Sequence, residues 1–328
     1  MPDSPSASTL AAEAAFLLHN SLAPNTRRNY EKIVRNYDSF CQKYCYNPYP
    51  SSFETVSHWL AQILSSVKTA TAKSYLGALK SFHVQTGRST SAFGDERLDL
   101  IIRGGKRIYG EGAKAIRYPI TSEILLRMVN EISDTEEGLN VKAALCVGFA
   151  AFLRSGEFTW NTWAPDSHCR QLSRQHVVFH PHSVTLTLPA SKTDQFRVGT
   201  EIYLAHSPLS PLCPVTALRS LFDRYLAHPH GHLFRRPFNQ PFTKPFFVLM
   251  MHQLLLNTGI SSVGFSGHSL RKGAAVTADR NGISKHDIKL LGRWKSDVVD
   301  IYIDERQKPE HIHKILQLNA QLLSSPLH

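Results

Sequence analysis

Apolar side chains recur every three or four residues through most of the first third of the chain. Residues 26–45 show this spacing clearly, and the apolar positions are Tyr30, Ile33, Val34, Tyr37 and Phe40. The pattern is typical of an amphipathic helix with one buried face. Similar stretches predict helices over residues 10–18, 52–64, 69–85 and 96–102, and no alternating strand pattern interrupts them.

The second half of the chain combines helices with a few strands. Residues 140–153 are strongly apolar, which predicts a buried helix that ends near Arg154. Residues 183–188 alternate between apolar and polar side chains, the period of a half-buried strand. Strands are also predicted at 177–179 and 198–204, and helices at 121–132, 214–227, 244–256, 269–281, 284–290, 297–302 and 309–323. We therefore expect a mainly α fold with a small antiparallel sheet, an α+β protein.

A short basic stretch with two glycines separates these two regions. Gly110, Gly112, Lys114 and Arg117 indicate an exposed linker. The chain begins with a stretch rich in Ser and Pro, which favours disorder. We divide the chain into a disordered arm (1–9), a helical domain (10–109), a basic linker (110–118) and a second domain with a C-terminal helix (119–328).

The charge balance favours a polyanionic partner. Lys and Arg number 37 against 26 Asp and Glu, so the net charge is +11. Nucleic acid is the first candidate for such a basic protein. A protein that is basic without binding nucleic acid remains an alternative on charge alone. No segment approaches the about 18 apolar residues of a membrane span, so no membrane partner is expected.

The cysteines and histidines do not predict a disulfide framework or a metal site. Five cysteines are scattered along the chain, which favours reduced thiols in an intracellular protein. His228, His230 and His232 alternate with Pro and Gly, and a polar loop explains them better than a zinc site.

The segment from Gly267 to Tyr302 contains the most informative chemistry. His268 and Arg271 lie three residues apart, so a helix places them on one face. Trp294 and Tyr302 follow on the next predicted helical segments. Together, these groups could bind a phosphodiester, move its protons and attack its phosphorus.

Two basic residues upstream extend this set. Arg154 ends the apolar helix, and Lys192 lies in the polar turn between two predicted strands. Taken singly, each residue has an ordinary structural explanation: Arg154 as a cation at a helix end, and Trp294 or Tyr302 as a core aromatic. The ordered set makes coincidence improbable.

This ordered set resembles the active site of the tyrosine recombinases. In that family an Arg, a Lys on a β-hairpin, a His-x-x-Arg pair, a His or Trp, and a Tyr occur in this order. The resemblance covers the whole second domain. It implies a two-domain clamp around double-stranded DNA, with the N-terminal helices as the core-binding domain and no cofactor or metal.

The resemblance also implies a role for each residue. Tyr302 would attack the DNA and form a 3′-phosphotyrosyl link, which conserves the energy of the broken bond. Arg154 and Arg271 would stabilise charge on the phosphoryl oxygens. The remaining roles would be His268 as base or proton relay, Lys192 as acid for the 5′-oxygen, Trp294 as an indole N–H donor, and Glu157 as a group that orients Arg154 or a neighbour.

Two features of the chain depart from the pattern of many family members and point to a subgroup of the family. Trp294 stands where many family members have His, and it precedes Tyr302 by eight residues where many bacterial members use nine. The segment from Gly292 to Asp297 looks more like the recombinases of eukaryotic mobile elements such as Cryptons and DIRS-like elements. That affiliation implies integration or excision of a mobile element, with the protein in the nucleus if the host is eukaryotic and in the cytoplasm otherwise.

The resemblance further implies DNA contacts and assembly. The candidate phosphate contacts are Lys68, Lys73, Lys80, Arg103, Lys106 and Arg107. A solvated helical face explains them equally well. The helix at 309–323 either packs on its own domain or on a neighbouring subunit, which would give a tetramer on DNA. Two other functions remain possible: a domesticated DNA-binding protein without cleavage, and a type IB topoisomerase, whose long coiled-coil linker before the Tyr is missing here.

Overall fold

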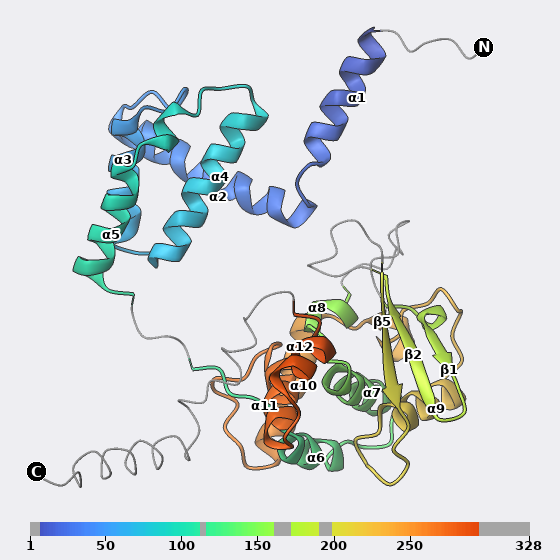
Figure 1. The fold of residues 1–328 in the computed structure, drawn as a ribbon. Helices are drawn as coiled ribbons and strands as arrows, with labels where there is room; N and C mark the ends of the chain where they lie inside the picture. Colours follow the sequence, from blue (N-terminus) through green and yellow to red (C-terminus); the bar gives the residue numbers. More distant parts are fainter. Residues whose placement is uncertain (1–6, 112–115, 161–171, 190–198, 295–328) are drawn as a thin grey trace, which may run out of the picture. The chain divides into compact units, whose positions relative to one another are not determined.

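The computed structural model describes residues 7–111, 116–160, 172–189 and 199–294, which form two compact units (Figure 1). The first unit covers Met1–Lys114 and the second Ala115–His328. The described residues are mostly helical, with small antiparallel sheets. The predicted fold class is therefore confirmed. No helix among the described residues is long and apolar enough to cross a membrane.

The described residues of the first unit form five α-helices. They are α1 (Ala7–Asn20), α2 (Pro24–Tyr44), α3 (Phe53–Leu64), α4 (Thr69–Gln85) and α5 (Arg97–Tyr109), with a short 3-10 turn, η1 (Ser91–Gly94), before α5. Its core forms around Trp59, which is fully buried. The Trp59 ring meets the Tyr37 ring edge to face, with 5.2 Å between the ring centres. The indole N–H of Trp59 donates to Asn36 Oδ1 at 3.0 Å, so the buried ring keeps its polar atom satisfied.

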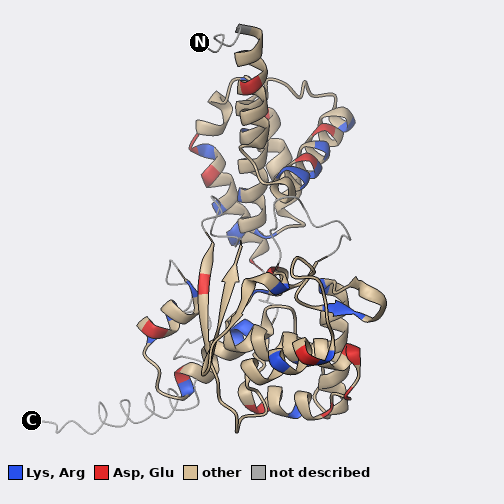
Figure 2. Ribbon diagram, turned by 90° about the vertical axis from the view of Figure 1, so that its right-hand side faces the viewer, with Lys and Arg blue, Asp and Glu red and all other residues tan. Residues whose placement is uncertain are grey.

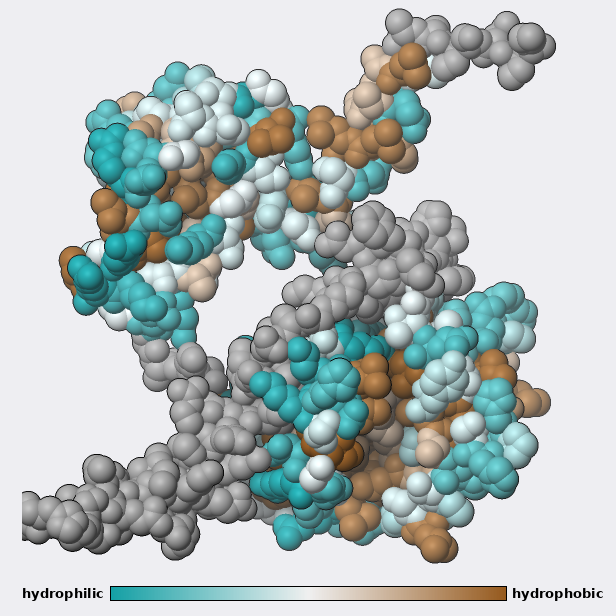
Figure 3. All heavy atoms as spheres, in the orientation of Figure 1, coloured by the Kyte–Doolittle hydropathy of each residue, from teal (hydrophilic) through white to brown (hydrophobic). Residues whose placement is uncertain are grey.

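Helix α1 begins within the segment that the sequence predicts to be disordered. We expected disorder over residues 1–9, but α1 begins at Ala7. The prolines of this stretch lie before Ala7, and the residues after it are rich in Ala and Leu, which favour helix. Leu10, Phe16 and Leu17 of α1 are exposed, and Figure 3 shows hydrophobic residues along this helix.

Helix α5 is longer than predicted, because it continues through Gly104 and Gly105, and Gly105 serves packing. The predicted helix ends at residue 102, whereas α5 continues to Tyr109. A Cβ on Gly105 would lie 2.9 Å from Leu64 Cδ1, so glycine allows α5 to pack closely on α3. Arg103, Lys106 and Arg107 consequently lie on a helix.

The second unit is built around one buried helix. The helices within its described residues are α6 (Ser122–Asn130), α7 (Glu136–Ala150), α8 (Ser155–Phe158), α9 (Pro214–Arg224), α10 (Lys244–Asn257), α11 (Ser269–Arg280) and α12 (Lys285–Gly292). Helix α7 is buried on nearly every face and packs against α9 and α11. Its start is capped by Thr135, whose hydroxyl accepts from the Gly138 N–H at 3.1 Å.

A three-stranded antiparallel sheet lies against this helical core. Its order is β1 (Val177–Phe179), β2 (Ser183–Leu188), β3 (Thr200–Ala205), and β1 follows the turn η2 (Arg174–His176). Val184, Leu186 and Leu188 are buried, as the alternation predicts. The strands β4 (Arg235–Arg236) and β5 (Gln240–Pro241) form a two-stranded antiparallel ribbon, and the turn η3 (Pro237–Asn239) connects them.

The end of the predicted linker is bonded to the second unit. The Tyr118 N–H donates to the Gly264 carbonyl at 3.0 Å, and Lys272 Nζ donates to the Arg117 carbonyl at 2.8 Å. The predicted helices at 297–302 and 309–323 lie outside the described residues. The four described cysteines are free: Cys41, Cys45, Cys146 and Cys213.

Candidate functional site

Arg154 begins a helix, whereas the sequence predicted that it ends one. Helix α7 stops at Ala150, and Phe152 takes a left-handed backbone conformation with φ of 51°. That conformation reverses the chain, so Arg154 becomes the N-cap residue of the short helix α8. The side chain of Arg154 remains 22% exposed and is accessible to a ligand.

Glu157 binds two arginines with one buried carboxylate. Its Oε1 accepts from Arg154 Nη1 at 2.8 Å, and its Oε2 accepts from the Arg154 backbone N–H at 2.8 Å. Oε2 also accepts from Arg293 Nη2 at 3.2 Å. Charge-assisted bonds of this kind are about twice as strong as neutral ones. Glu157 therefore orients Arg154, and it does so together with Arg293.

The guanidinium of Arg271 is buried and donates hydrogen bonds to backbone carbonyls. Only 2% of the residue is exposed. Its Nη1 donates to the Phe152 carbonyl and its Nη2 to the Gly292 carbonyl. The guanidinium carbon lies 4.3 Å from the centre of the Trp294 ring, a cation–π contact. In this arrangement Arg271 joins the chain reversal after α7 to the end of α12.

Trp294 packs as a partly buried aromatic at the end of α12. Its ring meets the Phe152 ring edge to face, with 6.0 Å between the ring centres. A Cβ on Gly292 would lie 1.6 Å from the Trp294 ring, so only glycine allows this close approach. The indole thus covers Arg271 and completes the hydrophobic cluster around Phe152.

His268 lies at the start of α11, beside the start of α8. The neighbouring Gly267 approaches Ser155 so closely that a Cβ there would lie 2.5 Å from Ser155 Oγ and 3.2 Å from Lys244 Cε. Burial lowers the pKa of His268, and the positive charges of Lys244, Arg117, Arg154 and Arg271 lower it further. Positive charge therefore gathers around a neutral imidazole, an arrangement suited to an anion.

The depressed pKa of His268 leads to a titration prediction. We expect a value below the usual about 6.5 in the free protein. Because the unfolded state takes up this proton at higher pH, His268 should favour folding above about pH 6.5 and lose that contribution as pH falls. A bound phosphodiester should raise the pKa, because its negative charge stabilises imidazolium.

NMR titration of the His268 ring, with and without duplex DNA, measures both values. The resonance is assigned by its disappearance in His268→Gln. A pKa at or above 6.5 without DNA would contradict the predicted effect of burial and neighbouring cations.

The structure brings together some of the predicted residues. Arg154, Glu157, His268, Arg271 and Trp294 meet where the start of α8, the start of α11 and the end of α12 converge. Lys192, on the segment that joins β2 to β3, and Tyr302 lie outside the described residues. No group of three His, Cys, Asp or Glu side chains suited to a metal occurs within the described parts of the chain.

Sequence reasoning missed three residues near this site. They are Arg117, Lys244 and Arg293. Arg293 could have been suspected because it directly precedes Trp294. Nothing in the sequence relates Arg117 or Lys244 to His268, because only tertiary packing brings their elements together.

The six candidate DNA contacts of the first unit are exposed on α4, its N-cap residue Lys68, and α5. Lys73 pairs with Asp99 at 3.6 Å and Lys106 with Glu111 at 3.3 Å. Such exposed pairs are weak and do not prevent contact with phosphate. Figure 2 shows acidic residues interspersed with the basic ones in this unit.

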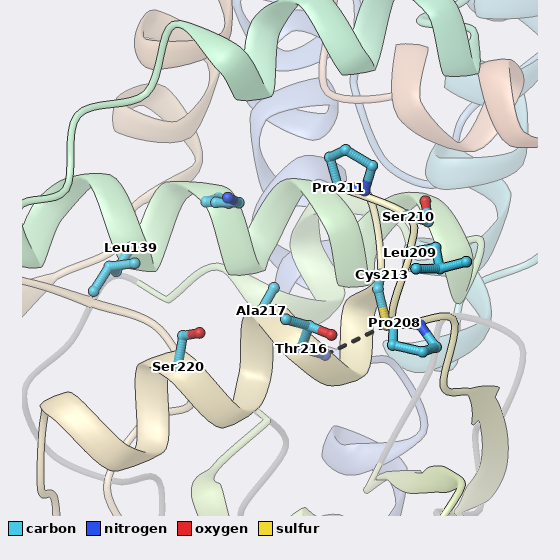
Figure 4. A pocket seen from close by; sticks show the side chains of 10 residues that line it. Leu139, Pro208, Leu209, Ser210, Pro211, Cys213, Thr216, Ala217 and Ser220 are labelled. Atoms are coloured by element: carbon cyan, nitrogen blue, oxygen red, sulfur yellow. Dashed lines mark hydrogen bonds between the residues drawn. The ribbon is translucent and has the colours of Figure 1, made fainter.

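A pocket of about 250 Å³ lies elsewhere in the second unit, between α7, α9 and the loop before α9 (Figure 4). Its lining includes Leu139, Pro211 and Cys213. Cys213 Sγ accepts from the Thr216 N–H at 3.4 Å and so caps α9. None of the predicted catalytic residues that the structure describes lines this pocket.

Comparisons with known proteins agree with the fold. The chain is 26% identical over 311 residues to an integrase/recombinase xerD homolog of Selenomonas ruminantium, covering 90% of this chain and 86% of that protein. No protein-family model matches the chain.

Solved structures show the same fold. A lambda integrase dimer bound to a COC′ core site matches with a TM-score of 0.57 at 16% identity, over 93% of this chain and 79% of that chain. A lambda integrase tetramer bound to a Holliday junction matches with a TM-score of 0.56 at 15% identity, over 86% of this chain and 75% of that chain.

The fold is that of the tyrosine recombinases. The chain is thus similar in sequence to an integrase/recombinase and shares its fold with the integrase structures.

Proposed function

We propose that the chain is a site-specific DNA recombinase that breaks and rejoins double-stranded DNA through a 3′-phosphotyrosyl bond to Tyr302. One observation carries the proposal. Arg154 is far from His268 and Arg271 in the sequence, yet the three gather at one place with the additional cations Lys244 and Arg117. A neutral imidazole among guanidinium groups suits a phosphodiester that must lose and gain protons.

The proposed steps divide between the residues. Tyr302 attacks phosphorus, its O–P bond forms, and the 5′-oxygen leaves with a proton from Lys192. His268 takes the phenol proton, which requires a neutral imidazole, and the lowered pKa of His268 in the free protein favours that form. The accessible guanidinium of Arg154 stabilises the developing charge. Arg271 and Trp294 complete the phosphate site, and the chemistry uses no cofactor.

The biological setting is part of the proposal. The Gly292–Asp297 segment resembles Crypton and DIRS-like recombinases, which supports integration or excision of a mobile element. Duplex DNA would be bound by the six basic residues of α4 and α5, and strand exchange would take place in a tetramer. A eukaryotic host implies the nucleus.

A DNA-binding protein without cleavage is the second candidate. One observation favours it: Arg271 is buried, and its guanidinium donates to the Phe152 and Gly292 carbonyls. A phosphate ligand would have to replace those bonds. This candidate predicts DNA binding with no covalent product.

Incubation with a nicked suicide DNA substrate, followed by denaturing electrophoresis, separates the two candidates. The substrate contains the sequences that flank the coding region of the element. The recombinase should form a covalent protein–DNA adduct and release a strand with a 5′-hydroxyl. Binding to this DNA without any adduct would favour the second candidate, and salt-sensitive binding alone would not distinguish them.

A further inference from the structure

We infer that Arg293 is a positioning residue that fixes the two arginines of the phosphate site relative to each other. This inference rests on the proposed function and adds to it a residue that contributes through its neighbours. Arg293 follows α12 directly and takes a left-handed conformation with φ of 57°. That conformation ends the helix and brings the chain to the α7–α8 reversal.

Arg293 contacts two groups that each hold a different arginine of the site. Its Nη2 donates to Glu157 Oε2 at 3.2 Å and to the Phe152 carbonyl at 3.4 Å. The Glu157 carboxylate also holds Arg154. The Phe152 carbonyl also accepts from Arg271. Nη2 of Arg293 therefore links the carboxylate that holds Arg154 to the carbonyl that holds Arg271.

The cost of burying Arg293 argues against a role in stability alone. Its side chain is 17% exposed, and its Nη1 is buried without a hydrogen-bond partner. A buried donor without a partner costs free energy. Glu157 does not need Arg293 for neutralisation, because Arg154 already pairs with it at 2.8 Å. A similar-sized apolar side chain should therefore be tolerated by the fold.

The position of Arg293 also connects the site to the proposed nucleophile. Arg293 is the residue before Trp294, and the chain continues from there to Tyr302. Because Arg293 donates to Glu157 and to the Phe152 carbonyl, a shift of the end of α12 would displace or break these contacts. Attack on phosphorus requires the phosphate site and the nucleophile to be aligned, and a misplacement of about 1 Å can cost about a hundredfold in rate.

The test compares Arg293→Met with the wild-type protein in three measurements. We expect single-turnover cleavage of the suicide substrate to slow by about 10- to 100-fold. The Kd for the same DNA should stay within about twofold, because Arg293 contributes no direct contact, and Tm should be equal or higher. Arg293→Lys keeps a charge near Glu157 without the planar fork, so its rate loss should be smaller.

Arg236→Met is the matched control. Arg236 also lies beside a glutamate, with its Nε 3.8 Å from Glu137 Oε2. Its guanidinium carbon lies over an aromatic ring, 4.4 Å from the centre of the Phe246 ring. Its Nε is likewise buried without a hydrogen-bond partner. Among the hydrogen bonds and ion pairs of the described residues, none joins Arg236 to Glu157 or Phe152, so cleavage should proceed at the wild-type rate.

The outcomes are distinct. An Arg293→Met protein that cleaves at the wild-type rate, or loses DNA affinity in proportion to its rate, overturns the positioning role while the proposed function stands. If Arg293→Met does not fold, Arg293→Lys decides: slower cleavage at wild-type Tm and Kd supports the inference, and a wild-type rate overturns it. A wild-type protein that forms no adduct removes the proposed function and this inference together.

Discussion

Replacement of Tyr302 by Phe is expected to abolish the covalent protein–DNA adduct. Phe keeps the ring and removes only the hydroxyl oxygen that would bond to phosphorus. Loss of a nucleophile removes the covalent route, so cleavage should fall by at least about a thousandfold. DNA affinity should be unchanged, because the cations that would hold phosphate are untouched. Adduct formation on a denaturing gel and Kd by fluorescence anisotropy measure the two effects.

Tyr225→Phe controls for the loss of a phenol elsewhere in the second unit. Tyr225 follows α9 and packs against the core of that unit. Its variant should form the adduct as the wild type does. An adduct that persists at the wild-type level in Tyr302→Phe would show that another residue attacks the DNA, and the assignment of the nucleophile would then be wrong.

Gly273→Ala is expected to destabilise the second unit strongly. A Cβ at this position would lie 1.6 Å from the Ile120 carbonyl oxygen. The clash is with backbone, which cannot rotate away, so α11 would have to move from residue 120. That shift would strain the bond from the Ile120 N–H to the Ser269 carbonyl, now 2.9 Å.

We expect Gly273→Ala to lower the free energy of unfolding by about 3 kcal/mol or more. For a unit of this size, that corresponds to a fall in Tm of about 6–12 °C. Because α11 begins beside His268, cleavage should fall as well. Differential scanning calorimetry measures the first effect, and the suicide-substrate assay the second.

Gly156→Ala is the matched control in the same unit. A Cβ on Gly156 meets nothing within 4 Å, so its stability should change by less than about 1 kcal/mol. Equal stability of Gly273→Ala and the wild type would mean that α11 is not held against residue 120 as described.

Some of the fold could be predicted because local sequence patterns determine it. The period of two in residues 183–188 predicted strand β2 with the observed bounds, and helical spacing did the same for α4. The prediction for α5 ended too early because Gly105 resembles a helix terminator in sequence. Its actual role is to allow contact with Leu64, which lies on another helix.

For the candidate site, too, the sequence predicted which residues take part but not the tertiary contacts they make. Residue types and order pointed to Arg154, His268 and Arg271, and the structure gathers them. The sequence did not predict that Arg271 would be buried against the Phe152 and Gly292 carbonyls. Nor did it predict that Arg154 would begin α8, because that depends on the left-handed conformation of Phe152.

The sequence by itself determined the mainly helical fold class, the basic charge and the ordered set of residues, because each depends on composition or local periodicity. The tertiary structure decided which cations surround His268 and which acceptors hold each arginine. Those relations join residues that are distant in the chain. Arg293 is the clearest example, since its link between Glu157 and Phe152 exists only when the end of α12 packs on the reversal between α7 and α8.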